Sequence, residues 1–157
     1  MSNSYCVTNF CIVKVKYFIL SVIAAVFLSS AIPGNRNLSI GSTAPEIQTL
    51  SGNSIFDNNN QNNIVVNFWS PKNPTSRILN KRLSDRYSQA DFNTEFISIC
   101  IDNESLMDEI LRIDSISEGK HFASTEINPR SLKDYNAEKT FGAYLISKEG
   151  KIISLNP

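Results

Sequence analysis

The residues best suited to chemistry lie in the stretch Asn73-Pro74-Thr75-Ser76, where a helix is predicted to begin. Free backbone amides at a helix N-terminus attract negative charge, so these side chains could form a site for an anion or a carboxylate. They can instead cap the helix by accepting hydrogen bonds from the same amides, and we prefer this interpretation. A nucleophilic Ser76 would need an adjacent base. The only histidine, His121, is predicted to lie far from this turn.

The three cysteines, Cys6, Cys11 and Cys100, have neither a Cys-x-x-Cys nor a zinc-knuckle spacing. Because the chain also has a single histidine, we expect no metal site, and no pattern indicates a cofactor. Cys100 lies within an apolar run, so we expect a buried thiol with a raised pKa. The alternative is a slow monothiol or dimer-forming role for Cys100.

The charge of the chain is balanced, with 15 basic and 15 acidic residues among 157. This balance excludes the basic footprint that nucleic-acid-binding proteins show. Four basic residues nevertheless cluster after the Asn73 turn, at Arg77, Lys81, Arg82 and Arg86. They could dock an acidic partner, but we prefer a solvated helix face.

The N-terminal region has the pattern of a secretory signal: Lys14 and Lys16, an apolar run at 17–28, and small residues up to Ala31. The apolar run is shorter than the ~20 residues that span a bilayer, so we prefer a signal cleaved after Ala31 to an uncleaved membrane anchor. We expect export to a bacterial periplasm or cell envelope. The sequence divides into a signal segment, a linker and one domain, at residues 1–31, 32–40 and 41–157.

The domain is predicted to alternate strands and helices. Residues 44–56 form a β-hairpin around Ser51-Gly52-Asn53, and apolar runs predict core strands at 64–68 and 96–101. A closing antiparallel hairpin is predicted from the strands at 143–146 and 151–155. This order predicts an α/β domain with a mixed central sheet and helices on both faces.

Three helices are expected between these strands. The first follows Thr75 and should bury an apolar face. That face consists of Ile78, Leu79, Leu83, Tyr87 and Ala90. The second, with apolar residues up to Ile113, should carry a Ser105–Asp108 capping box and an Asp108–Arg112 pair. The third should begin at Asn128-Pro129.

Three motifs in this order resemble the thioredoxin-like superfamily, and in particular the exported proteins of the TlpA/ResA and AhpC/TSA types. They are GSTAPEIQTLSG from Gly41, IVVNFWS from Ile64 and YLISKEGKIIS from Tyr144. The resemblance covers about residues 41–155. It implies a thioredoxin fold, in which the segment after IVVNFWS carries the redox site.

The sequence departs from the resembled family at that site. The positions that match the family's Cys-x-x-Cys pair hold Asn73 and Ser76. Neither residue supplies the thiolate that dithiol exchange needs. In the peroxiredoxin pattern Pro71 and Thr75 fit, but the position of the cysteine holds Ile78.

Two further departures lie near the C-terminus. No proline stands near Phe141-Gly142, where the family places a cis-proline against the redox site. The family's closing helix also has no counterpart before Pro157, so we expect either a truncated chain or an uncovered sheet face that could bind a partner.

We therefore expect an exported thioredoxin-like protein without dithiol–disulfide oxidoreductase activity, which serves as a binding or accessory module for a protein or peptide. Its working surface should comprise Asn73–Ser76 with Phe141 and Gly142, and Trp69 could stack on a ligand there, although we prefer a core role for Trp69. The alternative is an oxidoreductase or antioxidant protein that uses Cys100 or a partner's thiols. A third interpretation is a degenerate, poorly folded fragment.

Overall fold

The computed structural model describes residues 38–56, 62–87, 93–116 and 119–157. They all belong to one compact unit, Asn37–Pro157. The predicted signal segment and most of the predicted linker lie outside the described residues. Within the described ranges, no helix has the length and apolar character to cross a membrane.

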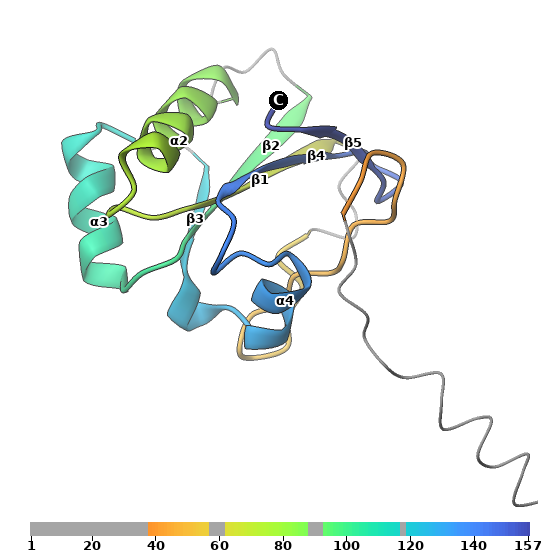
Figure 1. Ribbon diagram of the computed structural model, residues 1–157, viewed down its shortest axis with the longest axis horizontal. Helices are drawn as coiled ribbons and strands as arrows, with labels where there is room; N and C mark the ends of the chain where they lie inside the picture. Colours follow the sequence, from red (N-terminus) through yellow and green to blue (C-terminus); the bar gives the residue numbers. More distant parts are fainter. Residues whose placement is uncertain (1–37, 57–61, 88–92, 117–118) are drawn as a thin grey trace, which may run out of the picture. The chain divides into compact units, whose positions relative to one another are not determined.

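A five-stranded mixed sheet organises the described residues, with the strand order β3-β2-β1-β4-β5 (Figure 1). The strands are β1 Asn63–Trp69, β2 Thr94–Cys100, β3 Lys120–Ala123, β4 Gly142–Ile146 and β5 Ile152–Leu155. Parallel pairing joins β1 to β2 and β2 to β3, whereas β4 is antiparallel to both β1 and β5. The predicted mixed sheet and closing hairpin are confirmed. β3 was not predicted as a strand, because its four residues, KHFA, lack a clear apolar run.

Helices cover both faces of this sheet. The helices are α2 Pro74–Tyr87, α3 Glu104–Ile113 and α4 Pro129–Asp134, with a 3₁₀ turn at Ser124–Glu126. On one face, α2 packs against β1 and β2 through Leu83, and α3 packs against Trp69 and Cys100. On the other face, α4 and the N-terminal segment enclose an apolar cluster around Phe68 and Tyr135.

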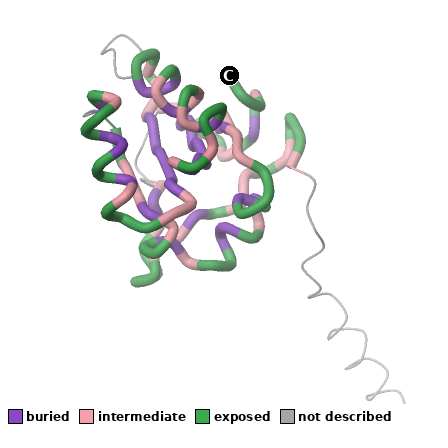
Figure 2. The backbone as a smooth tube through the Cα atoms, turned by 60° about the vertical axis from the view of Figure 1, so that its left-hand side comes forward, coloured by how far each residue is buried: buried purple, intermediate pink, exposed green. Residues whose placement is uncertain are grey.

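The central strand β1 is buried from residue 64 to residue 69 (Figure 2). Its side chains alternate between the two faces, as a strand requires. Val65 and Trp69 contact the side that α2 and α3 cover, and Phe68 contacts the side of α4. Because β1 ends at Trp69, the turn that follows it emerges at the C-terminal edge of the parallel strands.

The N-terminal hairpin forms only in part. Residues 47–55 do fold back at the predicted turn, since the Ile55 amide donates to the Ile47 carbonyl at 2.9 Å. They make isolated bridges, Gln48 to Ser54 and Thr49 to Ile127, instead of extended strands. The segment therefore packs as a bent strap on the α4 face and adds no strand to the sheet among the described residues.

The predicted buried face of α2 is partly wrong. Leu83 is buried as expected, but Ile78 is 60% exposed. Leu79 and Tyr87 also pack against the apolar cluster of the sheet, as predicted, and Ala90 lies outside the described residues. Three polar residues are buried beside Leu83, namely Ser76, Asn80 and Ser84. Among the described residues only Ile78 departs from the predicted face, and polar contacts as well as apolar ones fix the position of the helix.

The predicted details of α3 also change. Its cap is Asn103, whose side chain accepts from the Leu106 amide at 2.8 Å, instead of Ser105. Arg112 pairs with Glu109 at i,i+3 instead of with Asp108. The predicted start of α4 is confirmed, since the Asn128 side chain accepts from the Arg130 amide.

Candidate functional site

The turn between β1 and α2 is built around Asn73. Its side-chain oxygen accepts a hydrogen bond from the Ser76 amide at 2.9 Å, and its carbonyl accepts the first helical bond, from the Arg77 amide. The Asn73 amide in turn donates to the Ser70 carbonyl at 3.0 Å. The capping interpretation of Asn73 is therefore confirmed, and its side chain is committed to the backbone of the helix.

Ser76 holds the other end of the same turn. Its hydroxyl oxygen accepts from the Ser70 amide at 3.1 Å and lies 3.2 Å and 3.0 Å from the carbonyl oxygens of Ser70 and Asn73. The side chain is 4% exposed. No basic side chain is among these hydrogen-bond partners, so Ser76 has the environment of a structural hydroxyl and not of an activated nucleophile.

Behind the turn, α2 is joined to the sheet by a buried polar network. Trp69 Nε1 donates to Ser98 Oγ at 2.7 Å, and Ser98 Oγ donates to Asn80 Oδ1 at 2.9 Å. Asn67 Nδ2 donates to the same Asn80 oxygen at 2.9 Å. All four residues are at most 1% exposed. The core role of Trp69 is confirmed, and its use as an exposed stacking surface is excluded.

This network has two atoms without a hydrogen-bond partner in the described part of the chain, Asn67 Oδ1 and Asn80 Nδ2. Such buried groups weaken a fold unless other interactions compensate. The network was not predicted from the sequence. The available signal was the pair of polar residues in otherwise apolar strands, Asn67 in IVVNFW and Ser98 in FISIC.

Cys100 lies on the same face of the sheet but in an apolar environment. It is completely buried, beside Trp69 and Ala123 of the neighbouring strands and under Met107 and Leu111 of α3. Burial, and to a lesser extent the nearby Asp102 carboxylate, raises the pKa of the Cys100 thiol to about 12. The predicted buried thiol is confirmed, which removes the geometric basis for a reactive Cys100.

The predicted second half of the site, Phe141 and Gly142, begins β4. Gly142 pairs with Phe68, two residues before the turn starts at Ser70, so the two segments reach the same end of the sheet. A Cβ on Gly142 would stand 2.8 Å from Asn156 Oδ1, which accepts the Ala143 amide. All peptide bonds in the described segments are trans.

Ion pairs fasten the turn and the start of α2 to neighbouring loops. Lys72 Nζ lies 2.9 Å from Asp102 Oδ2, after β2. Arg77 forms a two-point contact with Asp114, at the end of α3, with Nε to Oδ2 at 2.7 Å and Nη2 to Oδ1 at 2.6 Å. These hydrogen bonds hold the pKa of both carboxyl groups below the ordinary range. Neither ion pair was predicted from the sequence.

His121 is separate from the turn. It lies in β3, in register with Ser98 of β2, and its ring packs edge-on to Phe96 at a centroid distance of 6.4 Å. The structure thus brings together Asn73 and Ser76 at the turn and places Gly142 at the same end of the sheet. It leaves Cys100 and Trp69 in the core.

Comparison with solved structures identifies the fold. The chain is similar to a thioredoxin-like protein from Parabacteroides distasonis, with 27% identity and a TM-score of 0.63 over 76% of this chain and 88% of that chain. It is also similar to the thioredoxin domain of a thiol-disulfide oxidoreductase from Bacteroides vulgatus, with 21% identity and a TM-score of 0.61 over 77% and 90% of the two chains.

A peroxiredoxin-like protein from Aquifex aeolicus shares the fold at 14% identity, with a TM-score of 0.59 over 76% of each chain. No protein-family model matches the sequence, and no curated protein matches it. The chain therefore has a thioredoxin-like fold, related to that of thiol-disulfide oxidoreductases.

Proposed function

We propose that this protein is a thioredoxin-like module that no longer carries out dithiol–disulfide exchange and instead binds a protein or peptide. The observation that carries the proposal is the turn itself. Asn73 and Ser76 stand where the family resemblance places the redox cysteines, and both side chains are used to hold the turn and cap α2. Neither can form a disulfide or supply a thiolate.

The redox alternative has little support in the described residues. Their only cysteine, Cys100, is buried in the apolar cluster, and its pKa of about 12 keeps the thiol protonated at neutral pH. Thiol exchange requires attack by an accessible thiolate. The similarity to thiol-disulfide oxidoreductases therefore concerns the fold of the domain, whereas the residues at the turn favour the binding of a protein or peptide.

Insulin reduction in the presence of dithiothreitol tests this proposal. We expect the full chain and its Cys100→Ser variant to be no faster than dithiothreitol alone. The double variant Asn73→Cys/Ser76→Cys should gain activity if the turn retains the geometry of a redox site and lacks only the sulfur atoms. Turnover by the unmodified chain that disappears in Cys100→Ser would overturn the proposal and make Cys100 a working thiol.

We also propose that the protein acts outside the cytoplasm, on the basis of the signal pattern before Ala31. Expression of the full chain in a bacterium, followed by fractionation and N-terminal sequencing, tests this. A mature chain that begins at Ile32 in the periplasmic fraction is expected. Full-length protein in the membrane fraction would indicate an anchor, and full-length protein in the cytoplasm would contradict export.

A further inference from the structure

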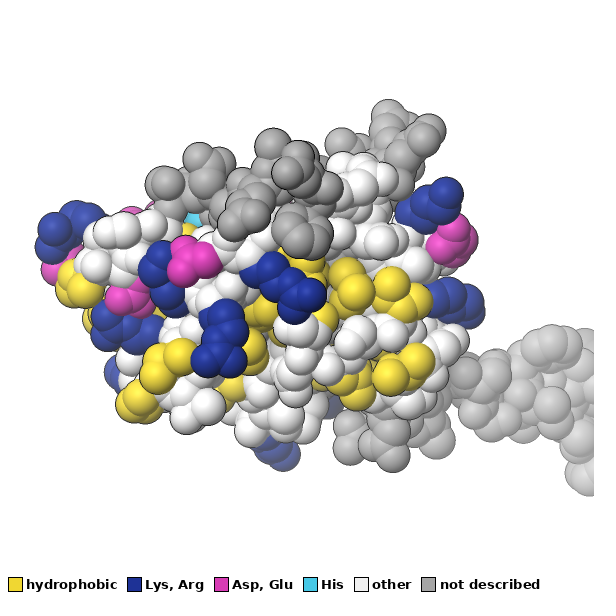
Figure 3. All heavy atoms as spheres, turned by 90° about the horizontal axis from the view of Figure 1, so that it is seen from above, with side chains coloured by type: hydrophobic (Ala, Val, Ile, Leu, Met, Phe, Trp, Pro, Cys, Tyr) yellow, Lys and Arg dark blue, Asp and Glu magenta, His cyan; other side chains and the backbone are white. Residues whose placement is uncertain are grey.

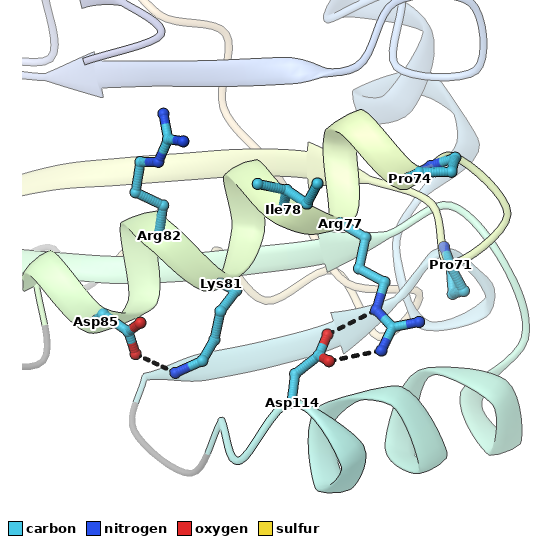
Figure 4. A pocket seen from close by; sticks show the side chains of 8 residues that line it. All are labelled: Pro71, Pro74, Arg77, Ile78, Lys81, Arg82, Asp85 and Asp114. Carbon is cyan, nitrogen blue, oxygen red and sulfur yellow. Dashed lines mark hydrogen bonds and ion pairs between the residues drawn. The ribbon is translucent and has the colours of Figure 1, made fainter.

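A groove runs along the outer side of α2, next to the turn and opposite the end of α3 (Figure 4). Its volume is about 610 Å³, which is in the range of ligand-binding clefts. It is lined by Pro71, Pro74, Arg77, Ile78, Lys81, Arg82, Asp85 and Asp114. Apart from Asp114, these residues come from the turn and from α2.

The apolar part of this groove is Ile78 with Pro71 and Pro74. Ile78 is 60% exposed, and Pro74 is also exposed. In Figure 4 the Ile78 side chain lies along α2 between Arg82 and the two prolines. A single exposed isoleucine is ordinary on a protein surface. Here it lines the same groove as two rigid proline rings, and together they could receive one aliphatic side chain of a ligand.

The charged part of the groove has an excess of positive charge. Arg77 is neutralised by Asp114, and Lys81 is paired with Asp85. Arg82 is exposed and has no ion pair or hydrogen bond within the described ranges. The groove therefore offers one available guanidinium beside its apolar part, and guanidinium groups bind carboxylates in a two-point geometry.

The charge of α2 contrasts with that of its surroundings. The helix carries four basic residues and one acidic residue, whereas residues 38–157 as a whole carry 12 basic and 15 acidic residues. The face seen from above in Figure 3 shows basic and apolar side chains next to one another. A positive patch on a domain of net negative charge favours an acidic ligand that is small enough to contact the patch alone.

We propose that this groove binds a short acidic peptide segment of another protein, with an aliphatic side chain against Ile78 and the prolines and a carboxylate on Arg82. The proposal rests on the proposed binding function and specifies the partner and the surface. In this proposal the turn before α2 remains part of the binding surface, and the outer side of α2 takes the place expected for Phe141 and Gly142.

Nuclear magnetic resonance titration of the ¹⁵N-labelled full chain tests the proposal. The probe is the acetylated and amidated peptide Ala-Glu-Leu-Glu-Ala, with Ala-Lys-Leu-Lys-Ala as the charge-reversed probe. We expect saturable amide shifts confined to residues 72–85 and 114 with the acidic peptide only. Added salt should weaken binding, since the contact with Arg82 is exposed to solvent.

Two variants and two matched controls locate the contacts. Arg82→Glu should weaken binding of the acidic peptide by about tenfold or more, and Ile78→Ser by a severalfold factor. Arg130→Glu makes the same charge change on α4, and Leu50→Ser removes a leucine that is 65% exposed in the N-terminal segment. Neither control should change the dissociation constant.

The acidic-peptide groove and the proposed binding function would be overturned by different results. Shifts that map elsewhere would overturn the groove and leave the binding function standing. Equal shifts with both peptides, no saturable shifts, or an unaffected Arg82→Glu variant would also overturn the groove. Shifts of residues 72–85 that depend on protein concentration without peptide would assign the groove to a second copy of the chain. Insulin turnover that requires Cys100 would instead overturn the proposed function.

Discussion

Helices α2 and α3 lie on the same face of the sheet but are held there by different contacts. The inner side of α3 is apolar, with Met107, Ile110 and Leu111 packed on Cys100. The inner side of α2 places Asn80 on Asn67 and Ser98, beside the apolar contacts of Leu79, Leu83 and Tyr87. The polar helix is the one that begins at the candidate site.

Apolar packing holds α3 on the sheet, whereas hydrogen bonds contribute to the position of α2. Apolar packing is non-directional, so α3 needs only side chains of suitable size and spacing. Hydrogen bonds are directional, so those of Asn80 fix both the rotation of α2 about its axis and its position along the sheet. The exposed position of Ile78, and thus the groove, follows from that rotation.

The largest expected difference between the two regions is in thiol reactivity. In a Cys6→Ser/Cys11→Ser background, Cys100 should react with Ellman's reagent at pH 8 roughly a thousandfold more slowly than a cysteine placed by Asn73→Cys in the Cys100→Ser version. Burial raises the pKa of Cys100 to about 12, whereas a helix N-terminus lowers a thiol pKa.

Stopped-flow absorbance in native buffer measures both rates, and concentrated guanidinium provides the control. The two thiols should react alike once the chain is unfolded. Rapid reaction of Cys100 in the native protein would mean that the α3 side of the sheet opens readily, and the contrast between the helices would then fail.

The next effect concerns the buried network. Asn80→Ala removes the acceptor for Asn67 and Ser98, and should lower the free energy of unfolding by about 2–3 kcal/mol, because two buried donors are left unpaired. Met107→Ala on α3 should cost about 2–5 kcal/mol through a cavity. Urea unfolding followed by circular dichroism measures both, and the exposed Asn93→Ala is the neutral control.

The double variant Asn67→Val/Asn80→Leu distinguishes the two mechanisms. If hydrogen bonding is what Asn80 contributes, replacement of both partners by apolar residues should cost less than the sum of the single changes. An additive loss would instead indicate simple packing, as on α3.

A single cooperative transition of the unmodified domain would also argue against the degenerate-fragment interpretation.

Local patterns in the sequence were enough to predict much of this fold. The run IVVNF, the closing hairpin and the Asn128 cap each depend on residues that are close along the chain. The same holds for α3, whose apolar residues recur at helical spacing. The capping role of Asn73 was also preferred correctly, since it acts three residues away.

Contacts between distant residues could not be predicted in this way. Asn80 meets Asn67 and Ser98 only after two strands have paired in a particular register. A helical pattern read alone assigns Ile78 to the core, because nothing local shows that polar residues replace it there. Arg77 and Asp114 are 37 residues apart, so their pairing depends on the placement of both helices.

The smallest expected effect comes from the ion pair that joins the two helices. Arg77 holds the pKa of Asp114 below its ordinary value, so the contribution of the pair to stability is complete above the ordinary pKa of ~3.9 and is lost as the pH falls through the lowered pKa. Asp114→Asn should therefore lower the free energy of unfolding by less than about 1 kcal/mol at pH 7. The difference from the unmodified chain should shrink as the pH falls through the lowered pKa of Asp114, since protonated Asp114 and asparagine are then alike.

Urea unfolding at pH 7, 5, 3 and 2 checks this, with Asp102→Asn as the comparison. Its partner Lys72 is 74% exposed, so solvent screens that pair more strongly and its removal should have a smaller effect than that of Asp114. A loss in Asp114→Asn that is the same at every pH would show that the side chain acts through its shape and not its charge. The contact between α2 and α3 would then belong to the packing that α3 already provides.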